Sequence, residues 1–234
     1  MIIVPLYPHD APGSEGLPNQ EWEKDGVVGE VSRPTLTVML PENPTGTGII
    51  VCPGGGYNVL VIEREGVAIG RRLNELGIAA FILKYRMDGP DHAHPLADAQ
   101  QAIRLVQSTI DWSVTPGRIG LMGFSAGGHL AAWTCVSDGQ RPDFAVPVYP
   151  RTLELNARVD VGCPPMFLVH AADDDVCPAD DSVRLFTALN QRGISVELHV
   201  FTRGGHGFDL GRLGSPEASW MDLMANWLRG QDLL

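Results

Sequence analysis

Apolar residues in this chain fall into short continuous runs that alternate with longer segments of helical spacing. The runs are rich in β-branched side chains and predict β-strands over residues 36–40, 48–52, 78–83, 118–122, 144–148, 165–170 and 196–201. The segments between and after them repeat apolar residues every three or four positions and predict helices over residues 61–76, 96–110, 126–136, 179–191 and 216–229. Strands and helices therefore alternate through most of the chain.

This alternation indicates an α/β fold. Strands that are apolar throughout are typical of a parallel sheet covered on both faces, so we expect a mostly parallel central sheet with helices on each side. Residues 1–35 are rich in proline, glycine and acidic side chains and predict an irregular arm packed on the domain. Residues 36–234 contain no repeat or linker that would divide them, so we expect a single domain without a large cap.

Composition and charge exclude several classes of protein. At 234 residues and 44% hydrophobic content, the chain can fill a substantial core. A net charge of −11 and an isoelectric point near 4.9 argue against nucleic acid or an anionic membrane surface as a partner. No apolar stretch approaches the ~20 residues of a membrane span. We see no secretory signal and expect a cytoplasmic protein, although a secreted protein trimmed of its leader would read the same.

The four cysteines are widely spaced and form no paired motif, which is typical of free buried thiols. The strongest chemical signal is instead a serine flanked by glycines. Gly123-Phe-Ser125-Ala-Gly127 lies between the strand predicted over 118–122 and the helix predicted over 126–136. A plain structural turn is the competing interpretation, but this context favours a nucleophile that the tight turn raises clear of the sheet. The backbone N–H of Ala126 then points toward the oxyanion that forms on an attacked carbonyl.

A second glycine cluster follows the strand predicted over 48–52. Three glycines come directly after Pro53, and without a Cβ they let backbone N–H groups approach a ligand oxygen closely. In the α/β-hydrolase fold the loop at this place completes the oxyanion hole, and we expect Gly55 and Gly56 to do so here. Phosphate binding is the alternative, but the loop lacks a lysine and both of the phosphate-binding glycine motifs.

An acid and a base follow the serine in the chain order that this fold uses for a catalytic triad. The strand predicted over 196–201 opens into a glycine-rich loop with His206, whose neutral imidazole could accept the proton of Ser125. The strand predicted over 165–170 opens into three consecutive aspartates, Asp173–Asp175. Spacing alone leaves each of the three available as the acid that orients the imidazole.

The remaining histidines have weaker claims to the role of base. His9 lies in the arm, and His170 lies at the end of a predicted strand. His199 lies within a predicted strand, and His129 follows the serine by one helical turn. His92 and His94 could suggest a metal pair, but no third ligand follows at a suitable spacing, so we expect a polar loop there. We therefore expect neither a metal nor an organic cofactor.

Short motifs that extend over nearly the whole chain carry a family resemblance. They are Pro53-Gly-Gly-Gly-Tyr57, Glu65-Gly66, Lys84-Tyr-Arg86, Asp98-Ala99, Gly123-Phe-Ser-Ala-Gly-Gly-His-Leu-Ala131 and Gly204-Gly-His-Gly-Phe208. Together they resemble the bacterial carbohydrate acetylesterases of the α/β-hydrolase superfamily, proteins similar to acetyl-xylan esterases and in some cases labelled xylanase-like. The resemblance implies that Asp174 is the catalytic acid, with Val176 and Pro178 also matching. Ala171 stands where a glycine is usual, which keeps Asp173 in reserve.

We therefore expect a serine esterase that hydrolyses short-chain acyl esters, acetyl above all, through an acyl-enzyme. Ser125 is the expected nucleophile, His206 the base and Asp174 the acid. The resemblance implies a small-molecule or oligosaccharide ester as substrate. By the same analogy, the side chains expected to flank the sugar are Tyr57, Asn58 and Phe208.

Three alternatives stay open at this point. A peptidase of the prolyl-oligopeptidase type usually needs a gating domain that this length does not hold. A dienelactone hydrolase uses a cysteine nucleophile where Ser125 stands. A non-catalytic binding protein on the same scaffold would not need the intact serine, acid and histidine.

Overall fold

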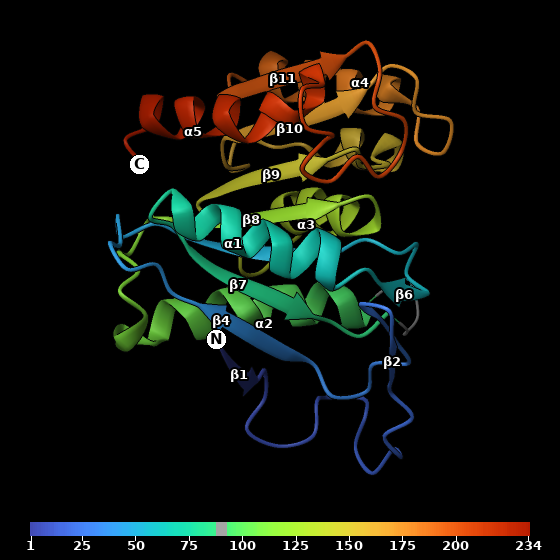
Figure 1. Ribbon diagram of the computed structural model, residues 1–234, viewed down its shortest axis with the longest axis vertical. Helices are drawn as coiled ribbons and strands as arrows, with labels where there is room; N and C mark the ends of the chain where they lie inside the picture. The colour runs from blue at the N-terminus through green and yellow to red at the C-terminus, as the bar shows by residue number, and fades with distance from the viewer. Residues whose placement is uncertain (88–92) are drawn as a thin grey trace.

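A central sheet organises the molecule. The computed structural model describes residues 1–87 and 93–234, and within them an eight-stranded sheet has the order β1-β4-β7-β5-β8-β9-β10-β11 (Figure 1). In chain order its strands are β1 (Ile2–Pro5), β4 (Thr35–Met39), β5 (Gly48–Cys52), β7 (Ala79–Lys84), β8 (Ile119–Phe124), β9 (Phe144–Val148), β10 (Met166–Ala171) and β11 (Val196–Phe201).

The strands from β7 to β11 in this order run parallel, whereas β1 and β4 join the β7 edge antiparallel. The predicted α/β fold with a mostly parallel sheet is therefore confirmed. The chain leaves β5 to form β7 on one side and then returns to form β8 on the other. At such a reversal the loops after the two strands diverge, and the crevice between them is where α/β proteins bind ligands.

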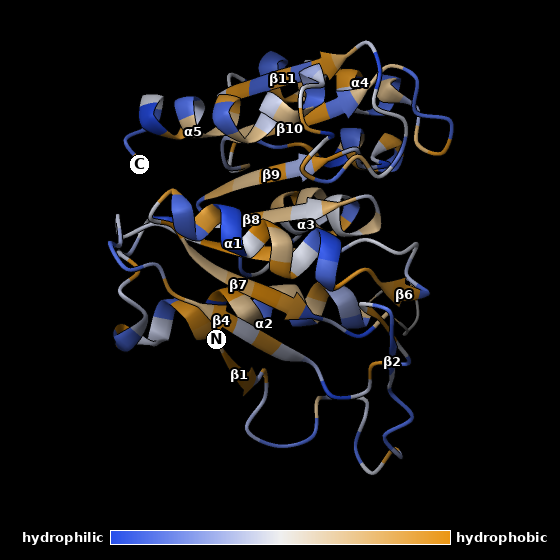
Figure 2. Cartoon of the chain, in the orientation of Figure 1, coloured by the Kyte–Doolittle hydropathy of each residue, from blue (hydrophilic) through white to orange (hydrophobic). Residues whose placement is uncertain are grey.

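Helices cover both faces of the sheet. α1 (Ala68–Glu75) and α5 (Trp220–Gly230) pack on one face, and α2 (Ala93–Ser108), α3 (Ala126–Val136) and α4 (Ala179–Gln191) pack on the other (Figure 1). α1, α2, α4 and α5 each turn an apolar stripe inward and a polar one outward, which gives α1 its mixed colouring in Figure 2 beside the mostly apolar β7. α3 is instead buried on nearly all sides.

The central strands are apolar throughout because both of their faces are buried. In β5, Ile50 packs into the core under α2 and α3, whereas Ile49 and Val51 pack into the core under α1 and α5. All three side chains are inaccessible to solvent. This burial explains why the sequence shows continuous apolar runs here and no alternation of apolar and polar residues.

The arm expected to be irregular contains three short strands. β1 pairs with β4 at the sheet edge, and β2 (Trp22–Lys24) and β3 (Val27–Gly29) form a small second sheet with β6 (Val59–Leu60). Asp25 and Gly26 join β2 to β3, and both have positive φ, as a two-residue hairpin turn requires. The expectation was wrong here because each of these strands is only three or four residues long, too short to show a periodic pattern. The Asp-Gly pair was the available signal.

Several helix ends also differ from expectation. The helix expected over 61–76 begins with a π-helical turn, η1 (Glu63–Val67), and the last helix is preceded by a 3₁₀ turn, η5 (Pro216–Ser219). Two further 3₁₀ helices lie outside the expected helices or at their end: η3 (Ile110–Trp112) begins at the last residue of the helix expected over 96–110, and η4 (Leu153–Arg158) lies in a stretch that the periodicity left as a loop. Of the helices in the described residues, none combines the length and the hydropathy needed to cross a membrane.

Candidate active site

Ser125 occupies a strained turn between β8 and α3. Its φ of 52° and ψ of −115° lie in a region that L-residues rarely adopt. The flanking glycines make the turn possible, because a Cβ at Gly123 would lie 2.0 Å from the carbonyl oxygen of Gly127, and one at Gly127 would lie 2.0 Å from that of Cys52. The turn leaves the Ser125 side chain partly exposed at the end of the sheet.

Ser125, His206 and Asp174 form one hydrogen-bonded chain. The Nε2 atom of His206 lies 2.8 Å from Ser125 Oγ, and its Nδ1 atom lies 2.8 Å from Asp174 Oδ2. Because a carboxylate can only accept, Nδ1 carries the proton and Nε2 is left to accept from the serine hydroxyl. The three loops follow β8, β10 and β11, whose carboxyl ends share one edge of the sheet. Such an arrangement can deprotonate a hydroxyl as it attacks a carbonyl carbon.

The Asp174 side chain is completely buried and held by its own loop. Its Oδ1 atom accepts the backbone N–H groups of Val176 and Cys177 at 2.9 and 2.8 Å. Burial alone would raise the pKa of Asp174, but these bonds and the one from His206 outweigh it and hold the pKa below its ordinary value. Asp174 therefore stays ionised and can stabilise an imidazolium at His206.

A second histidine, His170, lies buried beneath the acid. Its Nε2 atom lies 2.9 Å from the carbonyl oxygen of Cys177 and 3.3 Å from Asp174 Oδ2, and its Nδ1 atom lies 2.8 Å from Ser182 Oγ. Burial lowers the pKa of His170, so the ring is neutral. It supports the loop of the acid through hydrogen bonds to Ser182 and Cys177. Sequence reasoning set this residue aside, and its position four residues before Asp174 was the only signal.

The neighbouring aspartate has a different contact. The Oδ1 atom of Asp173 accepts the backbone N–H of Gly205 at 2.8 Å, directly before His206. The two adjacent carboxylates therefore both engage the histidine loop, Asp173 at its backbone and Asp174 at its ring. The structure brings Asp174 to the imidazole, and Asp173, kept in reserve from the sequence, anchors the loop.

The glycine loop after β5 lies beside the serine. Gly55 and Gly56 have φ values of +135° and +64°, which favour glycine, and a Cβ at Gly55 would lie 2.0 Å from the carbonyl oxygen of Val59. Gly56 and Ala126 line the same cavity as Ser125. The N–H of Gly54 is already engaged, because it donates to Glu65 Oε2 at 2.7 Å.

Glu65 connects this loop to the histidine side of the site. The residue is 5% exposed, and its Oε1 atom accepts the Tyr149 hydroxyl at 3.0 Å. The Tyr149 ring meets those of His206 and Phe208 edge to face, with centroids 5.1 and 4.7 Å apart. Burial raises the pKa of Glu65 to about 7. From the sequence, Glu65 was noted only as part of a family motif, and Tyr149 was not singled out.

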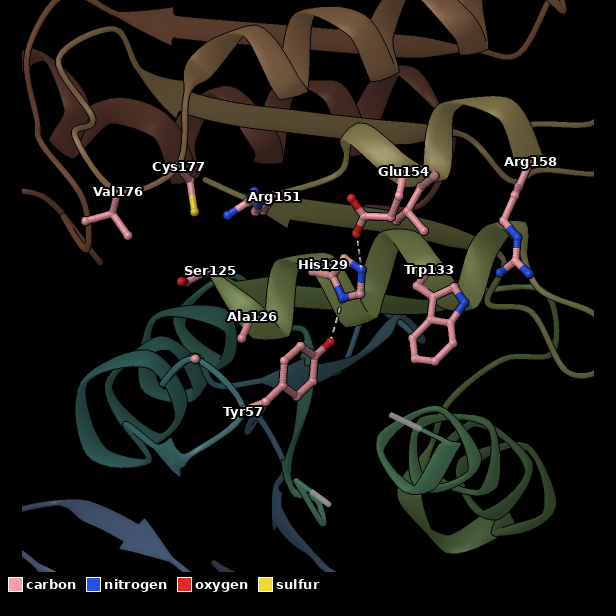
Figure 3. A pocket seen from close by; sticks show the side chains of 12 residues that line it. Tyr57, Ser125, Ala126, His129, Trp133, Arg151, Glu154, Arg158, Val176 and Cys177 are labelled. Carbon is pink, nitrogen blue, oxygen red and sulfur yellow. Dashed lines mark hydrogen bonds and ion pairs between the residues drawn. The ribbon is translucent and has the colours of Figure 1, made fainter. Parts of the chain in front are cut away.

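Ser125 opens into a cavity of about 800 Å³ (Figure 3). We call the part around Ser125 and Ala126 the reaction end, and the part around Trp133, Leu155 and Arg158 the far end. The cavity is lined by Gly56, Tyr57, Ser125, Ala126, His129, Trp133, Arg151, Glu154, Leu155, Arg158, Val176 and Cys177. Most of these residues come from α3 and from the segment after β9.

The side chains expected to flank a sugar are dispersed. Tyr57 lines the cavity, and its hydroxyl bonds His129 Nδ1 at 2.7 Å. Asn58 lines a separate cavity against the arm, and Phe208 packs on Tyr149. The sequence missed His129, Trp133 and Arg151 as lining residues, although Ser125, His129 and Trp133 share a four-residue spacing. Of the histidine pair considered as metal ligands, His92 lies outside the described residues.

Comparison with known proteins gives concordant matches. The model of the dienelactone hydrolase family matches residues 85–219. The acetylxylan esterase of Xylanibacter ruminicola is 29% identical over 229 residues, an alignment that covers 83% of this chain and 48% of that protein. The chain therefore spans about half the length of this relative.

Two solved structures are similar over most of their length. The acetyl ester-xyloside bifunctional hydrolase from Caldicellulosiruptor lactoaceticus has a TM-score of 0.84 and 27% identity, covering 100% of this chain and 97% of that one. MGS-M1, an α/β hydrolase from a Medee basin deep-sea metagenome library, has a TM-score of 0.73 and 29% identity, covering 83% and 91%. These matches confirm the expected α/β-hydrolase fold and the resemblance to acetyl-xylan-esterase-like proteins.

Proposed function

The chain belongs to the dienelactone hydrolase family, and we propose that it is a serine esterase that removes short acyl groups, acetyl in particular, from carbohydrates. The observation that carries this proposal is the hydrogen-bonded chain from Ser125 through His206 to Asp174, with both bonds of the imidazole at 2.8 Å. A structural serine would not need a histidine that is itself oriented by a buried, ionised carboxylate.

The reaction proceeds in two acyl transfers. Ser125 Oγ attacks the ester carbonyl carbon while His206 Nε2 takes the hydroxyl proton, and the imidazolium returns this proton to the departing alcohol oxygen. Water then attacks the acyl-enzyme, with His206 as base again, and releases the carboxylic acid and the free serine. Asp174 stays ionised throughout and stabilises the imidazolium.

The oxyanion of each tetrahedral intermediate is held by backbone N–H groups of Ala126, Gly55 and Gly56. Each such donor contributes roughly 3 kcal/mol to lowering the barrier, because it is aimed in advance at the place where charge develops. Glu65 supports this arrangement from outside, since it binds the N–H of Gly54 and so fixes the start of the glycine loop.

The substrate class rests on two supports. The relatives with similar sequence and structure are named for acetylxylan and acetyl ester hydrolysis. In addition, the half-buried Trp133 lines the cavity and offers an aromatic face of the kind on which a sugar ring can pack.

A thiol mechanism fits this site poorly. Cys177 is the only cysteine among the cavity-lining residues of the described chain, and burial raises its pKa to about 11. A thiol with that pKa is protonated at neutral pH and is a weak nucleophile. The elbow position carries Ser125, which favours a serine hydrolase within the family.

Active-site labelling and a substrate panel test the proposal. A fluorophosphonate probe should label the pure protein and fail to label Ser125→Ala, and kcat/KM should fall from 4-nitrophenyl acetate to longer acyl esters. Acetylated xylo-oligosaccharides should release acetate. Absence of labelling in the folded protein would indicate a binding protein, turnover of peptide amides a peptidase, and preference for octanoate a lipid esterase.

A further inference from the structure

One stripe of α3 forms the floor of the cavity. Ser125 precedes α3, and His129 and Trp133 follow at intervals of four residues, so all three lie on one face of the helix. The three line the cavity together with Ala126, and every residue of α3 other than His129 and Trp133 is buried. Eight residues of helix advance about 12 Å, so the floor is long enough for a substrate that extends well beyond the acyl group.

The wall above this floor carries two arginines. Arg151 and Arg158 come from the segment after β9 that includes η4, and both side chains line the cavity. Figure 3 shows Arg151 on the Ser125 side of Glu154 and Arg158 on the Trp133 side. Within residues 1–87 and 93–234, neither guanidinium has an ion-pair partner.

The positive charge of this cavity wall contrasts with the negative charge of the whole chain. The whole chain carries a net charge of −11, yet the two arginines outnumber the one acidic side chain of the cavity lining, Glu154. Glu154 is itself occupied, because its Oε1 atom lies 2.9 Å from His129 Nε2. A small local excess of positive charge in an acidic protein favours an anionic group on the ligand.

From this arrangement we infer that the cavity binds esters whose alcohol part carries a carboxylate, with Arg151 as the group that recognises it. The inference rests on the proposed function, because it assigns the alcohol side of the same ester to this wall. Arg151 lies on the Ser125 side of Glu154 (Figure 3), so it meets a carboxylate on the unit that bears the acyl group. Arg158 and Trp133 then meet the next unit of a longer substrate.

A singly charged carboxylate fits better than a phosphate. Guanidinium binds either group through paired N–H donors. The carboxylate of Glu154, whose side chain is 58% exposed beside the arginines, repels anions. This repulsion is stronger for a dianionic phosphate than for a singly charged carboxylate. An acetylated acidic sugar, such as a uronic acid, therefore has the chemistry that this wall selects.

A matched pair of aryl acetates tests the inference. The probes are 4-acetoxybenzoate and 4-acetoxybenzamide, which differ in charge but hardly in shape, and each kcat/KM is divided by the rate constant for hydrolysis of the same ester by hydroxide. Because a charge-assisted hydrogen bond contributes about tenfold or more, we expect the wild type to favour the benzoate by about 10-fold and Arg151→Gln to remove the preference. Arg192→Gln, which removes a charge from the end of α4, is the matched control and should retain it.

The other outcomes are equally informative. Equal use of both esters by the wild type, or the same preference in Arg151→Gln, overturns the inference while leaving the esterase intact. Loss of the preference in Arg192→Gln shows only a diffuse field and also overturns it. A larger preference for 4-acetoxyphenyl phosphate than for 4-acetoxybenzoate would mean that the cavity recognises a phosphate, and it overturns the assignment to a carboxylate. If the wild type hydrolyses neither ester and is not labelled by a fluorophosphonate, the proposed function itself has failed.

Discussion

The two ends of the cavity are built from different kinds of contact. At the reaction end, Ser125 has a strained backbone, and the groups behind it, Asp174 and Glu65, are buried and hydrogen-bonded. At the far end, Trp133 is half-buried and Arg158 is exposed on a short 3₁₀ helix. Because contacts at the reaction end depend on one another, we expect their loss to lower kcat and not to be additive. We expect contacts at the far end to act singly and to affect substrate binding.

The largest effect that separates the two ends is expected for His206→Ala. Removing the base leaves Ser125 without a proton acceptor, and kcat on 4-nitrophenyl acetate should fall roughly 10⁵- to 10⁶-fold, with little change in the melting temperature. The double variant with Ser125→Ala should be no slower than either single variant. A loss of less than about 10³-fold would show that the reaction uses another base.

The adjacent aspartates give the next largest contrast. Asp174→Asn removes the charge that orients the imidazole and should lower kcat about 10⁴-fold. Asp173→Ala removes one hydrogen bond from the backbone of the histidine loop and should lower kcat only about 10-fold. Asp173→Asn keeps an acceptor for the Gly205 N–H and should restore most of that loss. Equal losses in the Asp174 and Asp173 variants would contradict the division of roles.

This pair also shows what the sequence could predict. Ser125 and His206 are predictable because each lies where an apolar strand ends in a glycine-rich loop. Asp173 and Asp174 are not separable by spacing, since they adjoin in one loop and only its three-dimensional course turns one toward the imidazole. The family resemblance, and no local pattern, selected Asp174.

Contacts between segments far apart in the sequence could not be predicted from local sequence patterns. Glu65 and Tyr149 are 84 residues apart and meet only because β5 and β9 flank β8. The strands of the core were predicted well because their apolar runs record burial on both faces. The arm was predicted poorly, because β1, β2 and β3 are only three or four residues long and too short to show a pattern.

An intermediate effect on kcat is expected at Glu65, the buried residue that binds the glycine loop through the N–H of Gly54. Glu65→Leu leaves the N–H of Gly54 without its acceptor and frees the loop, so kcat should fall about 100-fold, comparable to loss of one oxyanion donor, with KM little changed. Glu65→Gln keeps an acceptor and should recover most of the rate. A rise in KM with unchanged kcat would place the effect in substrate binding instead.

A smaller effect, of the opposite kind, is expected at the far end. Trp133→Ala removes an aromatic face from the cavity floor and should raise KM for an acetylated xylo-oligosaccharide about 10-fold, while kcat and all constants for 4-nitrophenyl acetate stay unchanged. Trp133→Phe should retain much of the affinity. A fall in kcat on the small ester would show that the two ends are coupled.

The smallest effect concerns stability and pH, and it again compares the two ends. Burial raises the pKa of Glu65 from 4.5 to about 7, so between these values the folded protein holds a proton that the unfolded chain has released. The free energy of unfolding must therefore fall as pH rises through this interval and level off above it. Glu65→Gln cannot titrate, and relative to wild type its melting temperature should gain a few degrees between pH 5 and pH 8. Glu154→Gln, which changes a carboxylate that is 58% exposed, should show no such gain. An equal gain in both variants would show that burial does not distinguish Glu65 from Glu154.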